Sequence, residues 1–267
     1  EMSSRGLGDV YKRQPFIHAQ FARETKQDLI YEKLLAPLDG FEKTVKEFFA
    51  AGGKGLNVTV PFKEEAFRFA NDLTERAQLA GAVNTLALQK DGSLLGDTTD
   101  GAGLVGDLIR NNMQIEGARI LILGAGGAVR GVLEPLLKAQ PAQVVVANRT
   151  ASKAHDLAEV FGHLGDIHGC GFTDLDTSQF DTVVNGTSAS LSGELPPIPS
   201  SVFAKNAAAY DMMYSNELTP FLAWAEQCGV TQLADGIGML VGQAAESFKI
   251  WRGVVPCVKT VIQAMPK

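Results

Sequence analysis

The sequence predicts an α/β protein with two domains, one of them built on a parallel sheet. The apolar run RILIL (119–123) is followed directly by the glycine turn GAGG (124–127) and then by an apolar helical pattern. A second valine-rich run, VVV (144–146), begins shortly after that helix. Strand, helix and strand in this order are typical of a parallel α/β unit, and a chain of 267 residues is long enough for a second domain.

In the first 110 residues the pattern changes several times. Residues 1–14 have neither strand nor helix periodicity and are predicted to be a tail. A helix is expected from Phe16, because Ile17 and Phe21 are four residues apart and Pro15 suits a first helical position. The elements expected after it are a strand at 29–35, a helix at 41–50, a short strand at 55–60, a helical stretch at 63–81 broken at Asp72, a strand at 82–89 that enters a hairpin, and a helix through Ile109 opened by the polar turn 96–103.

The rest of the chain alternates between strands and helices. A Pro-rich loop is expected at 195–199. The other elements expected after the first parallel unit are a helix at 151–161, strands near 166–168 and 181–185, a strand at 207–211, a helix at 218–227, and two final helices at 236–250 and about 256–265.

The composition argues against several classes of function. The 24 basic and 30 acidic residues give a formal net charge of -6, so an extended nucleic-acid surface is not expected. The three cysteines are far apart and the four histidines lack metal-ligand spacing, so neither a disulfide framework nor a metal site is predicted. No uncharged apolar run reaches about 18 residues, so no membrane span is expected and a cytoplasmic location is predicted.

The glycine turn after RILIL is a candidate dinucleotide-binding loop. Gly124 allows the tight turn, and Gly126 lets backbone N–H groups approach a pyrophosphate at the helix N-terminus. The predicted loop residues are Gly124, Ala125, Gly126, Gly127 and Ala128. Because Val129 replaces the third glycine of the usual motif, a strand–helix turn that merely needs glycine remains an alternative.

The residues after the second strand predict the choice of coenzyme. An NAD-binding protein usually carries an acidic residue there to hold the ribose hydroxyls. This chain has Asn148, Arg149, Thr150 and Lys153 instead, with no acidic residue between Pro141 and His155. Two cations suit the 2′-phosphate of NADP. The alternative is a solvated basic helix start, which runs against the helix dipole.

Polar residues upstream of the glycine turn form a candidate catalytic set. Asn57 and Thr59 share one face of a strand, and Asn84 lies within an apolar run, where an unbonded amide would destabilise the fold. Lys63 is predicted to exchange a proton with a substrate oxygen, and Asp100 to orient it. Lys63 as a solvated loop residue and Asp100 as a simple helix cap remain alternatives, because spacing does not show that the two meet.

Six ordered motifs carry a family resemblance. NVTVPFKE, AGAVNT, GDTTDG, GAGGAVRG, ANRT and ADGIGMLVGQA resemble those of NADP-dependent shikimate dehydrogenases from Pro15 to about Met265. The resemblance implies reversible reduction of 3-dehydroshikimate to shikimate in aromatic amino acid biosynthesis. It implies a substrate domain at 15–100 and 236–267, a Rossmann-like NADP domain at 101–235, and an active site in the cleft. It also implies that Lys63 and Asp100 are catalytic, that Asn57, Thr59, Asn84, Gln243 and Tyr214 bind the substrate, and that Thr187, Met212 and Gly236 lie near the cofactor.

The start of the chain departs from the family pattern. The family opens with an apolar strand and a Ser-x-Ser-Pro motif that holds the substrate carboxylate, whereas Lys12 and Gln14 stand at the two serine positions before Pro15. Residues 1–14 are therefore expected to be non-native, and the chain as written to be unstable or weakly active. Two other functions stay open: an NAD-dependent quinate/shikimate dehydrogenase, and a catalytically impaired NADP-binding relative. The chain is expected to be a monomer or a homodimer with only small-molecule ligands.

Overall fold

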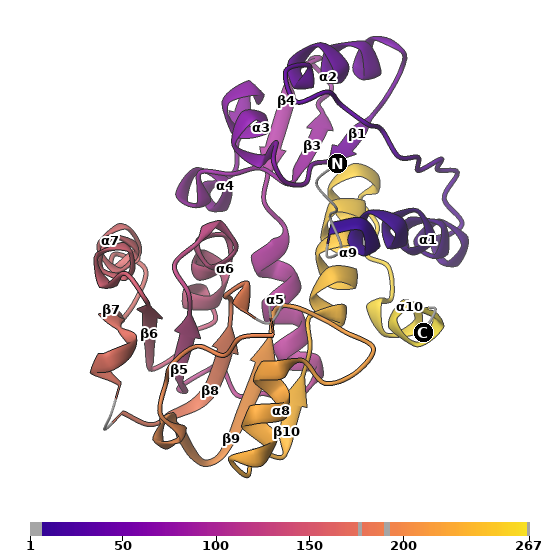
Figure 1. Cartoon of the computed structure of the whole chain (residues 1–267). Helices are drawn as coiled ribbons and strands as arrows, with labels where there is room; N and C mark the ends of the chain where they lie inside the picture. Colours follow the sequence, from indigo (N-terminus) through magenta and orange to yellow (C-terminus); the bar gives the residue numbers. More distant parts are fainter. Residues whose placement is uncertain (1–6, 176–177, 190–192, 266–267) are drawn as a thin grey trace. The chain divides into compact units, whose positions relative to one another are not determined.

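The computed structural model describes residues 7–175, 178–189 and 193–265 (Figure 1). The chain divides into two compact units. Unit 1 contains the residues up to Gly103 together with those from Leu240 onward, and unit 2 spans Leu104–Met239. Both units combine helices with a β-sheet, which confirms the predicted α/β class.

Unit 1 contains a four-stranded sheet in the order β1-β3-β4-β2. β3 pairs antiparallel with both β1 and β4, while β2 is parallel to β4. The strands are β1 (Gly55–Asn57), β2 (Asp72–Leu73), β3 (Thr85–Leu88) and β4 (Leu94–Asp97). The helices are α1 (Leu7–Thr25), α2 (Phe41–Ala50), α3 (Lys63–Phe69), α4 (Glu75–Ala80) and α10 (Val258–Ala264), with parts of α5 (Asp100–Arg110) and α9 (Ile237–Arg252).

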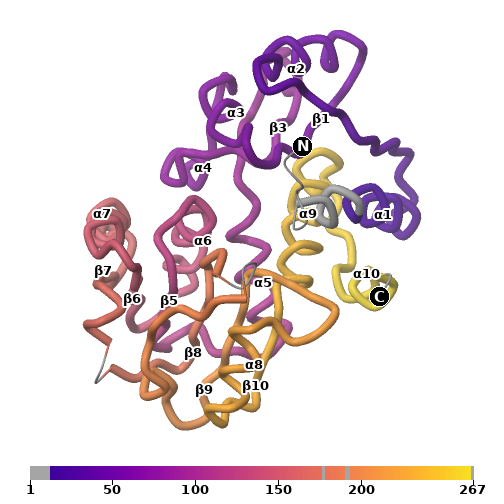
Figure 2. The backbone as a smooth tube through the Cα atoms, in the orientation of Figure 1, coloured from indigo at the N-terminus to yellow at the C-terminus, as the bar shows by residue number. Residues whose placement is uncertain are grey.

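The first and last helices of the chain lie together in unit 1. In Figures 1 and 2, α1 runs beside α9 and α10. Phe21 on α1 meets Phe248 on α9 edge to face, with ring centroids 5.6 Å apart, and both side chains are fully buried. A C-terminal helix therefore returns to pack with the N-terminal part of the chain.

Unit 2 contains a six-stranded parallel sheet in the order β10-β9-β8-β5-β6-β7. Ile120–Leu123 of the central strand are fully buried, as expected for a parallel strand that is covered on both faces. The strands are β5 (Arg119–Leu123), β6 (Gln143–Asn148), β7 (Ile167–Gly171), β8 (Phe180–Asn185), β9 (Phe203–Asp211) and β10 (Gln232–Ala234). The helices within the unit are α6 (Gly127–Lys138), α7 (Ala151–Phe161) and α8 (Pro220–Gln227). The predicted Rossmann-like topology is confirmed.

Two predictions near the N-terminus were wrong. Helix α1 begins at Leu7, so Pro15 lies inside the helix and not at its first position, and residues 7–14 are helical although their sequence shows no apolar period. The expected strand at 29–35 is not formed. Ile30 and Leu35 are 85% and 86% exposed, because none of the described strands pairs with this segment to bury them.

Strand β2 was read from the sequence only as a break in a helical stretch, and strand β10 was missed. The reason is clearest at β10. It has only three residues, all half-buried, and so carries no apolar period that sequence reasoning could detect.

Candidate active site

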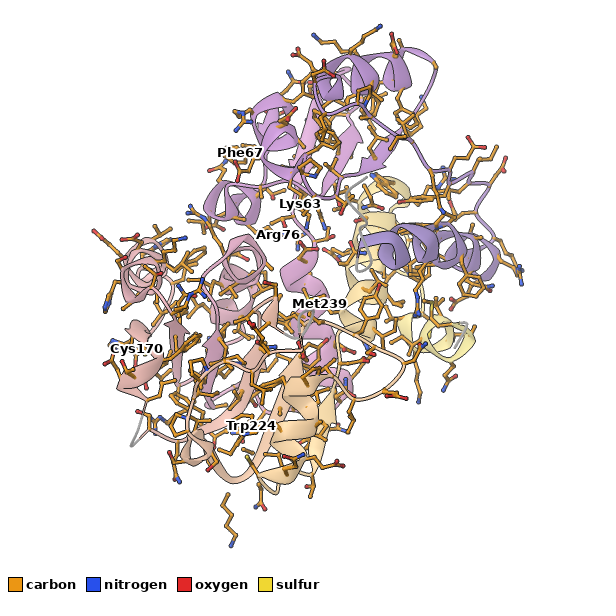
Figure 3. The ribbon with its side chains drawn as sticks, in the orientation of Figure 1. Lys63, Phe67, Arg76, Cys170, Trp224 and Met239 are labelled. Carbon is orange, nitrogen blue, oxygen red and sulfur yellow. The ribbon has the colours of Figure 1, made fainter. Side chains whose placement is uncertain are left out.

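The predicted proton donor and its partner meet in unit 1. Lys63 is the first residue of α3 and Asp100 the first residue of α5. The Lys63 Nζ donates to Asp100 Oδ2 at 2.6 Å, and the two side chains are 30% and 19% exposed. Lys63 is labelled in Figure 3. A partly buried, charge-assisted hydrogen bond of this kind fixes the ammonium group but leaves it accessible to a ligand.

Asn84 connects this pair to a second predicted substrate residue. It precedes β3 and is buried, and its Nδ2 donates to Asp100 Oδ1 at 3.0 Å and contacts Gln243 Oε1 at 3.4 Å. Its Oδ1 accepts from the Thr99 backbone N–H at 3.0 Å. Lys63, Asp100, Asn84 and Gln243 thus form one connected polar group, which the spacing of these residues in the sequence does not show.

Asn57 joins the same network through a buried serine. The Nδ2 of Asn57 donates to Ser247 Oγ at 3.0 Å, and Ser247 Oγ lies 2.7 Å from Thr85 Oγ1 and 3.2 Å from Thr99 Oγ1. Thr59 does not join it: within the described residues its exposed side chain makes no hydrogen bond to the network.

An ion cluster anchors the turn that carries Asp100. Arg76, labelled in Figure 3, donates from Nε and Nη2 to both carboxylate oxygens of Asp97, at 2.8 and 2.7 Å, and from Nη2 to Glu246 Oε1 at 3.2 Å. Asp97 is buried and also accepts from the Thr98 backbone N–H. Because Asp97 lies three residues before Asp100, this bidentate contact holds the chain where it enters α5.

In unit 2 the predicted cofactor residues gather at the carboxyl ends of the parallel strands. Gly124 follows β5, and a side chain there would press on Gly186 and Thr187, which follow β8. Met212, after β9, donates its N–H to the Asn185 carbonyl, and a Cβ on Gly236 would overlap the Met212 carbonyl. Ligands of open parallel sheets bind outside this edge.

The glycine turn has the form that a dinucleotide requires. Gly124 has a φ of 104°, which only glycine adopts readily, and Gly126 caps α6. Ideal Cβ atoms on Gly126 and Gly127 would have no atom within 4 Å, so the backbone there faces open space, as it does at Ala128, which is exposed. The loop, including half-buried Ala125, thus leaves room for a phosphate at the N-terminus of α6.

The predicted 2′-phosphate residues follow the neighbouring strand. Arg149, Thr150 and Lys153 are exposed, and half-buried Asn148 donates from Nδ2 to the Thr150 carbonyl at 3.0 Å. Neither cation forms an ion pair with a carboxylate of the described residues. Two uncommitted positive charges fit the phosphate that distinguishes NADP from NAD.

Tyr214 lies in the other unit from the remaining predicted substrate residues. It belongs to the turn after β9 in unit 2 and is half-buried, whereas Asn57, Asn84 and Gln243 belong to unit 1.

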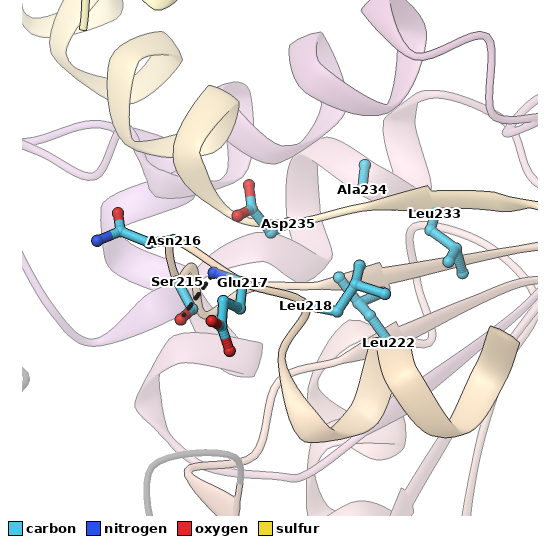
Figure 4. Close-up of a pocket in the computed structure, with 8 residues that line it drawn as sticks. All are labelled: Ser215, Asn216, Glu217, Leu218, Leu222, Leu233, Ala234 and Asp235. Atoms are coloured by element: carbon cyan, nitrogen blue, oxygen red, sulfur yellow. Dashed lines mark hydrogen bonds between the residues drawn. The ribbon is translucent and has the colours of Figure 1, made fainter. Parts of the chain in front are cut away.

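Unit 2 contains a cavity of about 360 Å³ (Figure 4). It is lined by 215–218, Leu222 and 233–235, so none of the predicted site residues contributes to it. Burial raises the pKa of Asp235, which together with Glu217 gives the cavity its only ionisable groups. The predicted catalytic residues Lys63 and Asp100 belong to the polar group of unit 1 and not to this cavity.

The described residues show no other reactive centre. No group of three or more potential metal ligands is found among them, and the three cysteines are unbonded. None of the described helices combines the length and the apolar character that crossing a bilayer requires.

Three family profiles match successive parts of the chain. They are described as the shikimate dehydrogenase substrate binding domain (residues 11–86), shikimate / quinate 5-dehydrogenase (107–192) and the shikimate 5'-dehydrogenase C-terminal domain (236–265). The chain belongs to the shikimate dehydrogenase family.

Relatives of this chain match it over nearly its whole length. A shikimate dehydrogenase (NADP(+)) of Cellvibrio japonicus is 55% identical over 96% of this chain and 92% of its own length. The one of Vibrio campbellii is 52% identical with the same coverage. Among solved structures, an Ael1 enzyme from Pseudomonas putida has a TM-score of 0.91 and 44% identity, and covers 98% of this chain and 96% of its own. Shikimate 5-dehydrogenase from Thermus thermophilus, in complex with NADP(H) and shikimate, has a TM-score of 0.82 and 31% identity, with 96% and 94% coverage.

Ser247, His18 and Tyr31 are among the network residues that sequence reasoning missed, together with Thr85 and Thr99. Ser247 is four residues after Gln243 on α9, so helical spacing could have placed it on the same face. His18 and Tyr31 both contact Asn57 Oδ1, at 3.2 and 2.9 Å. No sequence pattern indicates those contacts, because they join segments 39 and 26 residues apart.

Proposed function

We propose that this protein reversibly reduces 3-dehydroshikimate to shikimate with NADPH. The observation that carries the proposal is the Lys63–Asp100 contact of 2.6 Å, joined by the buried amide of Asn84. A ketone that accepts a hydride also needs a proton on its oxygen, and a fixed, accessible ammonium group can supply one. The identities of 52–55% to NADP-dependent shikimate dehydrogenases support the same reaction.

Unit 1 is proposed to bind the substrate and to exchange the proton. Asn57, Asn84 and Gln243 offer amides to a polyhydroxylated ring, and Thr59 offers an exposed hydroxyl two residues after β1, outside the strand that the sequence predicted for it. Lys63 donates a proton to the substrate oxygen during reduction and accepts it during oxidation. Asp100 holds the ammonium group in place and balances its charge. Tyr214, from unit 2, is proposed to meet the substrate carboxylate.

Unit 2 is proposed to bind NADP(H), which supplies or accepts the hydride. The 124–128 loop receives the pyrophosphate, and Arg149 and Lys153 hold the 2′-phosphate, with Asn148 and Thr150 beside them. Thr187, Met212 and Gly236 lie at the same sheet edge and are proposed to contact the cofactor.

Parallel assays of shikimate oxidation with NADP+ and with NAD+ test the function. Formation of the reduced coenzyme with NADP+, and much less with NAD+, is the expected result. A preference for NAD+ would instead support a quinate/shikimate dehydrogenase of the NAD-dependent kind. Tight NADP+ binding without turnover of either coenzyme would support an impaired relative.

One observation favours the impaired relative as a second candidate. β1 pairs with β3 on one edge, and no other described strand lies on its second edge. Gln14, which stands at a serine position of the family motif, has a buried Oε1 without a hydrogen-bond partner among the described residues. An unpaired strand edge and an unsatisfied buried oxygen both destabilise a domain. We therefore propose that the open edge of β1 and the unsatisfied oxygen of Gln14 lower the stability of unit 1.

A further inference from the structure

Asn57 is held by hydrogen bonds at both its amide oxygen and its amide nitrogen in unit 1. Its Oδ1 accepts from Tyr31 Oη at 2.9 Å and lies 3.2 Å from His18 Nε2. Its Nδ2 donates to Ser247 Oγ at 3.0 Å and contacts the Asn84 carbonyl oxygen at 3.4 Å. A carbonyl oxygen only accepts, so the amide nitrogen has to face Asn84 and the amide oxygen has to face the two aromatic rings.

This orientation also fixes the tautomer of His18. Because Asn57 Oδ1 is an acceptor, His18 Nε2 must carry the hydrogen. His18 is fully buried, and its ring is stacked on Tyr31 with centroids 4.1 Å apart and planes 9° from parallel. Phe21 meets the same imidazole edge to face, and Phe248 lies 6.3 Å from it. Burial lowers the pKa of His18 to about 3, although the hydrogen bond to Asn57 opposes that shift, so the imidazole is neutral near neutral pH.

The side-chain amide of Asn84 is oriented like that of Asn57, with its oxygen facing donors of the protein. Its Oδ1 accepts from the Thr99 N–H at 3.0 Å and from Thr85 Oγ1 at 2.8 Å, which occupies both lone pairs. Its Nδ2 is directed to Asp100 Oδ1 and Gln243 Oε1. In both amides, therefore, donors from the protein occupy the oxygen, and the nitrogen is directed away from them.

We propose that His18 and Tyr31 are positioning residues that hold Asn57 as an N–H donor toward the substrate. The inference rests on the proposed function, because it assigns Asn57 to the substrate. One N–H of Asn57 is committed to Ser247, while the other makes only long contacts of 3.4 Å and is the one that a substrate oxygen can take. The substrate hydroxyl at Asn57 then accepts a hydrogen bond from the amide N–H. A second substrate hydroxyl can donate a hydrogen bond to the carboxylate of Asp100.

Tyr31→Phe is the most selective test, since it removes the donor oxygen and keeps the ring stacked on His18. We expect the KM for shikimate to rise about fivefold while kcat and the KM for NADP+ stay within about twofold, because one neutral hydrogen bond is lost on the substrate side. In an Asn57→Ala background the same change should have no further effect, since the amide through which Tyr31 acts is gone.

Tyr210→Phe is the matched control in unit 2. Tyr210 is fully buried, whereas Tyr31 is half-buried, and the Tyr210 hydroxyl donates to Asp107 Oδ2 at 2.7 Å, so its removal costs stability. Neither Tyr210 nor Asp107 belongs to the proposed site. The KM for shikimate should therefore be unchanged in this variant, and a rise equal to that of Tyr31→Phe would show a general loss of stability and overturn the inference.

A second measurement works without turnover. The side-chain amide signals of Asn57, assigned by their loss in Asn57→Ala, should shift and exchange with solvent faster in Tyr31→Phe. Unchanged amide signals overturn the inference, as does an unchanged KM in an active enzyme or an equal effect in both backgrounds. If the parent chain turns over no shikimate, the proposed function is contradicted. The positioning role is then tested only by comparing the Asn57 amide signals of the parent with those of Tyr31→Phe.

Discussion

Acidification should destabilise this protein through a single buried histidine. The pKa of His18 is lowered from 6.5 to about 3 by burial, with the Asn57 hydrogen bond opposing. A group whose pKa is lower in the folded state binds its proton first in the unfolded state, so its contribution to stability is complete above pH 6.5 and is lost progressively as the pH falls toward 3. At about pH 5 the loss is roughly 1.5 pH units times 1.36 kcal/mol, or about 2 kcal/mol.

The perturbation is the substitution His18→Phe, which keeps an aromatic ring beside Tyr31 and removes the titrating group. Urea unfolding at about pH 7.5 and about pH 5, followed by circular dichroism, gives the free energy of unfolding for the parent and the variant. The parent should lose about 2 kcal/mol more than His18→Phe between the two conditions. His155→Phe, at an exposed position of α7, is the control and should keep the pH dependence of the parent.

Equal losses in the parent and in His18→Phe would refute the reasoning. The imidazole would then titrate alike in the folded and unfolded chains, which is incompatible with a fully buried ring whose Nδ1 has no partner among the described residues. A greater loss in the variant would be equally contradictory, because phenylalanine binds no proton.

Three further predictions concern catalysis. Lys63→Ala and Asp100→Asn should each lower kcat for shikimate oxidation by about 10²–10⁴-fold without changing the Kd for NADP+, and a normal kcat in either variant would remove the proton-transfer role. Arg149→Asp should lower kcat/KM with NADP+ by about 10- to 100-fold and weaken the discrimination against NAD+, and unaltered discrimination would contradict the 2′-phosphate assignment. Replacing residues 1–14 by an apolar strand that ends in Ser-x-Ser before Pro15 should raise kcat/KM for shikimate by about tenfold or more, and no gain would show that the N-terminus is adequate as it is.

Much of the fold could be predicted because local patterns and tertiary packing agree in unit 2. RILIL is apolar at four successive positions that the structure buries completely, and the glycine turn after it ends the strand. Local pattern and packing disagree at 29–35, where the apolar residues suit a strand but no strand of the described part of the chain pairs with them. Strand formation depends on a partner elsewhere in the chain, and a local pattern does not report on that partner.

The site was predictable as a set of residue types but not as a connected group. Lys63, Asn84 and Asp100 stand out in the sequence because polar side chains beside apolar runs destabilise the fold unless they are hydrogen-bonded or serve a function. Their contacts cross 16 and 37 residues of sequence, so only the folded chain shows that the ammonium and the amide reach the same carboxylate. Ser247 and His18 lie among apolar neighbours of their helices and look like packing residues until Asn57 is placed beside them.

Helix α1 connects the residues before Pro15 to Asn57, which is proposed to bind the substrate. Gln14 and His18 are four residues apart on this helix, so they lie on the same face, and His18 contacts Asn57. A change before Pro15 that shifts α1 therefore also shifts the ring that holds the amide. For this reason the gain in kcat/KM for shikimate from a strand added before Pro15 and the loss in kcat/KM from His18→Phe should not be additive. Without the imidazole, the position of α1 no longer affects the orientation of the Asn57 amide through this contact.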